Sequence, residues 1–89
     1  MKDKKIEQLF GGVLRKWRTR RGFSQHELAR RAHLHRSYIS DVERGERNTS
    51  LQSIKKLADA LNISPQRLFQ FETVFGTGKM KNISNLSSP

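Results

Sequence analysis

Residues 33–48, HLHRSYISDVERGERN, carry side chains that suit recognition of another molecule by hydrogen bonding. If the stretch is helical from about Arg36 to Arg44, Ile39 and Val42 share one side and face inward. The other side is short and polar, and it contains Arg36, Ser37, Ser40 and Asp41. The major groove of DNA admits one helix and displays donors and acceptors on its base edges, so this polar side fits double-stranded DNA.

The charge balance of the chain also favours a polyanionic partner. Among 89 residues, 18 Lys and Arg stand against eight Asp and Glu, which gives a formal net charge of +10. A generally basic surface or an anionic membrane would account for that excess as well. The distribution favours nucleic acid, because residues 15–21, RKWRTRR, concentrate five basic side chains near one predicted helix end without any acid.

Other chemistries find no support in the sequence. The chain lacks cysteine, and His26, His33 and His35 do not have the spacing of a metal-binding set. It has no phosphate-binding glycine loop and no serine–histidine–aspartate order. No apolar run approaches the ~20 residues of a membrane helix, and no secretory signal is visible. We therefore expect a cytoplasmic protein that is not an enzyme and holds no metal or cofactor.

A helix is predicted over residues 6–20, where apolar side chains recur at spacings of three and four. Gly22 follows as a residue that ends the helix. Gly11 and Gly12 lie inside it, and they either weaken its first turn or mark a close contact with another helix. The helix supplies one apolar stripe to a core.

Four more helices are predicted after this one. A short helix over 24–32 begins with a capping-box pattern, and the helix over 36–44 follows after a brief link. A fourth helix covers 51–61, and Ser64 and Pro65 open a fifth. Because no stretch alternates with a period of two, we expect a compact all-α domain.

The chain divides into three parts by composition. A basic segment covers residues 1–8 and the folded domain covers 9–71. Residues 72–89 are rich in Gly, Ser and Asn, which predicts a polar flexible tail, with a short strand-like piece at 73–75.

Two short helices joined by a tight link make a helix-turn-helix arrangement. Residues 23–64, FSQHELARRAHLHRSYISDVERGERNTSLQSIKKLADALNIS, resemble the Cro/C1-type (XRE-like) family of helix-turn-helix regulators. The matching features are Ser24-Gln25, Glu27-Leu28-Ala29, Tyr38-Ile39-Ser40, Glu43-Arg44-Gly45 and Leu57-Ala58 with Leu61. The run RSYISDVERGERN is also similar to the controller proteins of restriction–modification systems.

The resemblance implies a five-helix, lambda-repressor-like DNA-binding domain. It implies a transcriptional regulator that binds a (pseudo)palindromic operator as a homodimer and represses or activates by blocking or recruiting RNA polymerase. In the family, the second helix of the motif presents its N-terminal residues to the bases.

Base contacts are therefore implied for Arg36, Ser37, Ser40 and Asp41. Arg36 would donate to guanine O6 and N7, which we favour over a phosphate contact or a solvated side chain. For the two serines, a place on the helix surface competes with base contact. The Asp41 carboxylate would accept from cytosine N4 or pair with a nearby arginine, and we favour the intramolecular pair.

The resemblance also implies contacts to the DNA backbone, made by Ser24, Gln25, Tyr38, Arg44, Arg47 and Asn48. The N-terminus of the helix over 24–32 would add backbone donors there. Structural roles compete at three positions. Gln25 could simply begin its helix, the ring of Tyr38 could be buried, and Arg44 could stabilise the end of its own helix.

Glu43 has an implied structural role, because the matching glutamate of the family pairs with an arginine that corresponds to Arg18. Two positions depart from the family pattern. His33 stands where glycine is frequent, which predicts a left-handed backbone, and His35 stands near the helix start, where Ser or Thr is more usual.

The segment FQFETVF, residues 69–75, is more apolar than a free tail requires. We favour a dimer interface here, with Leu68, Phe69 and Phe71 as candidates. The alternative is a protein-interaction module, such as an antitoxin or a phage-type repressor acting through its C-terminal segment. Dependence of DNA affinity on salt separates the two hypotheses.

Overall fold

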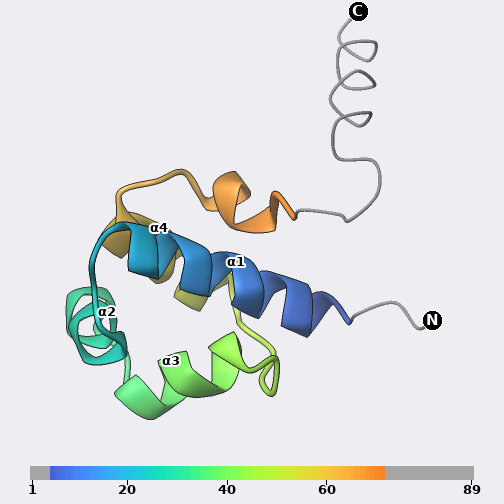
Figure 1. The fold of residues 1–89 in the computed structure, drawn as a ribbon, viewed down its shortest axis with the longest axis horizontal. Helices are drawn as coiled ribbons and strands as arrows, with labels where there is room; N and C mark the ends of the chain where they lie inside the picture. Colours follow the sequence, from blue (N-terminus) through green and yellow to red (C-terminus); the bar gives the residue numbers. More distant parts are fainter. Residues whose placement is uncertain (1–4, 72–89) are drawn as a thin grey trace, which may run out of the picture.

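The computed structural model describes residues 5–71, and all elements in this range are helical (Figure 1). They are the α-helices α1 (Ile6–Arg20), α2 (Gln25–Ala32), α3 (Arg36–Glu43) and α4 (Leu51–Leu61) and the 3-10 helix η1 (Pro65–Phe69). The all-α prediction is confirmed. The predicted tail 72–89 and its strand-like piece at 73–75 lie outside the described residues.

One predicted element differs from the structure in type. The fifth helix is a single 3-10 segment, because it spans only five residues and the chain leaves helical geometry at Gln70 (φ −91°, ψ 86°). At the other end, α1 begins at Ile6, as the predicted helix 6–20 does, and so includes residues 6–8 of the segment 1–8. There the backbone N–H of Lys5 donates to Oε1 of Gln8 at 3.3 Å and helps to close the helix start.

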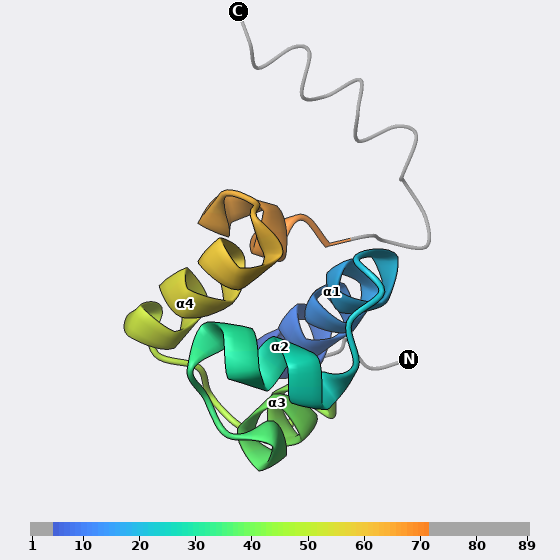
Figure 2. The same cartoon turned by 90° about the vertical axis from the view of Figure 1, so that its left-hand side faces the viewer.

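The core lies where the inward sides of all five elements meet. It consists of Phe10, Leu14, Leu28, Ala29, Ala32, Ile39, Val42, Ile54, Leu57, Ala58, Leu61 and Leu68. Helices α2 and α3 lie together on one side of the molecule and η1 lies on the opposite side (Figures 1 and 2). Helix α1 packs against both α3 and η1, so it joins the two sides.

Residues with left-handed backbone end two of the helices and let the chain turn sharply after them. His33 has φ 59° and ends α2, and the next N–H, of Leu34, donates back to the Ala29 carbonyl at 2.9 Å. The departure from glycine at this position thus keeps the backbone geometry that a glycine would adopt. Asn62 (φ 59°) ends α4 in the same way. Within residues 5–71, no helix has the length and apolar character needed to span a bilayer.

Candidate nucleic-acid interface

Helix α3 is held by its aliphatic side, which leaves its polar side outward. Ile39 and Val42 are fully buried, whereas Arg36 and Ser37 are exposed. Helix α2 packs along α3 and contributes the buried Leu28. The predicted separation of an inward aliphatic side and an outward polar side is therefore present.

Arg36 begins α3 and projects from an exposed position. Among residues 5–71, it takes part in no hydrogen bond or ion pair. His35 precedes it with extended backbone and without a capping hydrogen bond from its side chain. The guanidinium therefore keeps its donors for an external acceptor.

The outward residues nearer the end of α3 form a polar network. Arg44 donates to Oγ of Ser40, to Oδ1 of Asp41 at 2.6 Å and to Oε1 of Glu46 at 3.1 Å. The second oxygen of Asp41 lies 3.5 Å from Nη2 of Arg47. Four of the predicted DNA-contacting residues are therefore in contact with one another: Ser40, Asp41, Arg44 and Arg47.

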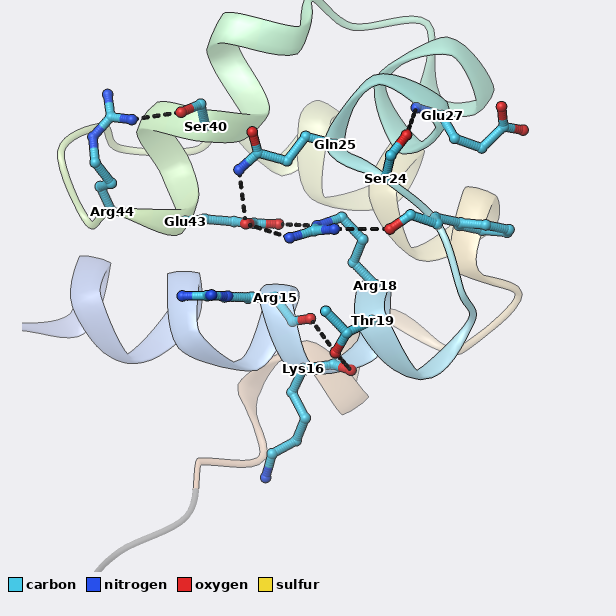
Figure 3. Close-up of polar contacts among 11 residues, drawn as sticks. Arg15, Lys16, Arg18, Thr19, Ser24, Gln25, Glu27, Ser40, Glu43 and Arg44 are labelled. Atoms are coloured by element: carbon cyan, nitrogen blue, oxygen red, sulfur yellow. Dashed lines mark hydrogen bonds and ion pairs between the residues drawn. The ribbon is translucent and has the colours of Figure 1, made fainter.

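A buried ion pair ties α3 to α1 (Figure 3). Nε of Arg18 lies 2.6 Å from Oε2 of Glu43, and the two side chains are only 12% and 4% exposed. Arg18 also donates to the Phe23 carbonyl at 2.8 Å. Gln25 donates from its amide to Oε1 of Glu43 at 3.0 Å, so the carboxylate joins three helices. The starts of α2 and α3, which are the ends predicted to face DNA, are thereby held at fixed positions relative to each other.

The Ser24 side chain caps the start of α2. Oγ of Ser24 accepts from the Glu27 backbone N–H at 3.0 Å, which is one of the two hydrogen bonds of the predicted capping box. The Glu27 carboxylate itself binds Arg30 and Arg31 on the next turn. Hydrogen bonds from Arg30 and then Arg31 lower the pKa of Glu27 below its ordinary value.

The loop after α3 brings the remaining backbone-contact candidates together. The guanidinium of Arg47 lies 5.0 Å from the ring centroid of Tyr38, whose ring is half-buried against the core. Asn48 follows in the same loop and is exposed. This loop lies at one end of α3, and Arg36 lies at the other.

The basic run 15–21 does not form a single surface. Arg18 turns inward to Glu43, while Trp17 lies on the side of α1 that faces η1. Guanidinium carbons of Arg20, Arg21 and Arg67 lie 5.1, 5.5 and 5.8 Å from the Trp17 ring centroid. This group of cations therefore lies on the side of α1 that faces η1, and α1 itself lies between η1 and α3 (Figure 1).

The three candidates for the dimer interface have different environments. Leu68 is completely buried in the core of its own chain, so its assignment to an interface is wrong. Phe69 is 44% exposed, and its ring centroid lies 5.3 Å from that of Phe10 and 6.1 Å from that of Phe71. Phe71 is half-buried. The 3-10 geometry decides this outcome, because at three residues per turn neighbouring side chains point about 120° apart.

An apolar hollow that sequence reasoning missed adjoins Phe69. It has a volume of about 230 Å³, and its apolar lining includes Ile6, Phe10 and Ile54. Ile6 is 52% exposed at its rim. The sequence signal was the position of Ile6, one turn before Phe10 at the start of the predicted helix 6–20.

Comparison with known proteins agrees with this geometry. The sequence profile of the helix-turn-helix family matches residues 14–68. Control protein C.BamHI from Bacillus amyloliquefaciens is 46% identical over 70 residues, which cover 78% of this chain and 86% of that protein. Control protein C.SmaI from Serratia marcescens is 41% identical over 63 residues, covering 71% and 75%.

Solved structures give the same result. The restriction–modification controller protein C.AhdI from Aeromonas hydrophila superposes with a TM-score of 0.70 at 52% identity, covering 71% of this chain and 96% of that one. On these grounds, the chain belongs to the helix-turn-helix family of DNA-binding transcriptional regulators.

Proposed function

We propose that this protein is the controller of a restriction–modification system. It binds a (pseudo)palindromic operator as a homodimer in the cytoplasm and acts on a nearby promoter by blocking or recruiting RNA polymerase. The similarity to C.BamHI and C.AhdI supports this context.

The exposed Arg36 at the start of α3 carries the proposal. Its donors have no partner within residues 5–71, and its helix is held from behind by Ile39 and Val42. An arginine in this position donates two parallel hydrogen bonds to guanine O6 and N7. Ser37 and Ser40 follow on the outward side and make the shorter-range base contacts.

Phosphate contacts flank this helix on both sides. At the start of α2, Ser24 and Gln25 lie beside backbone N–H groups that favour an anion. At the far end of α3, the loop supplies Arg47 and Asn48, with Arg44 and the Tyr38 ring beside it. These contacts set the position of α3 without reading sequence.

The dimer forms through the apolar surface around Phe69, Phe71 and Ile6. Exposed aromatic and aliphatic side chains next to a hollow of about 230 Å³ are suited to burial against a second copy. Two copies of α3 related by a twofold axis then read half-sites about one DNA turn apart.

Selection of bound duplexes from a random pool, followed by footprinting, tests the proposal. We expect enrichment of a two-part symmetric site whose half-sites are spaced by about one helical turn. Recovery of unrelated sequences with uniform protection would contradict sequence-specific binding. Asymmetric sites bound by a monomer would contradict the dimer alone.

A further inference from the structure

We infer that Asp41 limits the affinity of the protein for DNA, for the operator as well as for other sequences. Its carboxylate restrains Arg44 and Arg47 and thereby lowers the attraction of the protein for DNA of any sequence. The inference rests on the proposed function, and it replaces a base contact by Asp41.

The contacts of the carboxylate support this role. Oδ1 accepts from Arg44 at 2.6 Å, and Oδ2 lies 3.5 Å from Nη2 of Arg47. Both oxygens therefore face an arginine of the same chain. To accept from cytosine N4, the Asp41 carboxylate would have to break at least one of these two arginine contacts.

The surroundings of Arg44 and Arg47 separate them from Arg36. Glu46 also binds Arg44, so the two arginines face two carboxylates. The far end of α3 is thus locally neutral, in a chain whose net charge is +10. Arg36, by contrast, has no described acid beside it. The positive charge that no described acid balances therefore lies at the start of α3, the end proposed to contact bases.

The same restraint acts in both kinds of DNA complex. Binding without sequence preference depends on how many phosphates the protein neutralises, so a carboxylate beside two arginines weakens it directly. The side chains involved are partly exposed, at 52% for Arg44 and 50% for Arg47, so they can turn from the carboxylate to phosphate. They must leave the same carboxylate in the operator complex, which gains additional free energy from base contacts.

Asp41→Asn tests the inference, with Asp59→Asn as the matched control. Asp59 makes an exposed pair with Lys55 on α4, so its substitution changes the net charge equally but leaves α3 untouched. Affinities are measured for a random-sequence duplex and for a duplex carrying the operator selected by the wild-type protein. For Asp41→Asn we expect affinity for the random duplex to rise about fivefold, with a salt slope steeper by about 0.9. Operator affinity should rise by a similar factor, because Arg44 and Arg47 leave the same carboxylate to reach operator phosphates.

A second comparison shows whether the effect passes through the arginines. In an Arg44→Gln/Arg47→Gln background, Asp41→Asn should no longer raise affinity for the random duplex. The inference is overturned if Asp41→Asn and Asp59→Asn behave alike, or if the effect persists in that background. It is also overturned if Asp41→Asn changes the preferred base at one operator position, which would show a base contact. If the wild-type protein selects no operator at all, the proposed function fails instead.

Discussion

Gly11 of α1 lies directly against the backbone of Glu43 at the end of α3. A Cβ atom at Gly11 would lie 2.8 Å from the Glu43 carbonyl oxygen and closer still to that of Val42. Gly12, one residue further along the same helix, faces open space. Of the two interpretations of this glycine pair, close helix contact applies to the first residue. The position of α3 therefore depends on the absence of one side chain in α1.

Substitution of these two glycines by alanine should have opposite effects. Gly11→Ala should lower the free energy of unfolding by about 1–3 kcal/mol, because the new methyl group meets backbone that cannot easily move. Gly12→Ala should raise it by about 0.5–1 kcal/mol, since alanine favours the helix. Urea denaturation measures both values. Equal effects of the two substitutions would show that the contact with α3 does not restrict Gly11.

Removing one partner of the Arg18–Glu43 pair should be costly. Glu43→Gln should destabilise the fold by about 3–5 kcal/mol, because Arg18 stays buried as an unpaired charge. Arg18→Met/Glu43→Leu should recover much of this loss. Thermal and urea unfolding provide the measurement, and Asp59→Asn, in an exposed pair, should cost at most about 1 kcal/mol. A loss for Glu43→Gln as small as that of the control would rule out a stabilising role for the buried pair.

Substitutions at Leu68 and Phe69 should have different effects, the first on the stability of the fold and the second on dimer assembly. Leu68→Ala should reduce stability by about 2–5 kcal/mol, because it leaves a cavity in the core. Phe69→Asp should leave the monomer folded and shift the dimer towards monomer, since it places a charge in the apolar surface. Circular dichroism and sedimentation velocity distinguish the two results. An unchanged sedimentation coefficient for Phe69→Asp would place the dimer interface elsewhere.

Arg36→Ala should relax sequence selection. We expect a loss of about 1–3 kcal/mol of discrimination at one base pair in each half-site. Arg30→Ala, which removes an exposed arginine of α2, serves as the control for charge alone. Binding to a panel of singly substituted operators reads out the effect. If Arg36→Ala weakens binding to every duplex equally, the side chain contacts phosphate.

The Glu27 pairs should contribute a pH-dependent part of the stability. Because Arg30 and Arg31 lower the pKa of Glu27 in the folded chain, the contribution is present above the ordinary pKa of 4.5 and is lost as pH falls through the lowered value. Melting temperatures of the wild type and Glu27→Gln, compared from neutral to acid pH, should therefore converge at low pH. A difference that grows on acidification would have the wrong sign.

Local sequence patterns determined the helices and most of their ends. Spacing of apolar residues placed α1 and α4, and Ser24 with its capping pattern placed the start of α2. These features depend on residues a few positions apart, so a single sequence is enough to reveal them. The left-handed backbone at His33 was expected from the resemblance, because the family often has glycine at that position.

Only the tertiary structure decided which polar side chains bind one another. It showed that Gln25 binds Glu43 across 18 positions, and that Asp41 faces both Arg44 and Arg47. It also turned Leu68 inward and Phe69 outward, which periodicity does not resolve in a segment of five residues. The physical reason is that side-chain partners are chosen by distance in space, and helix packing sets that distance.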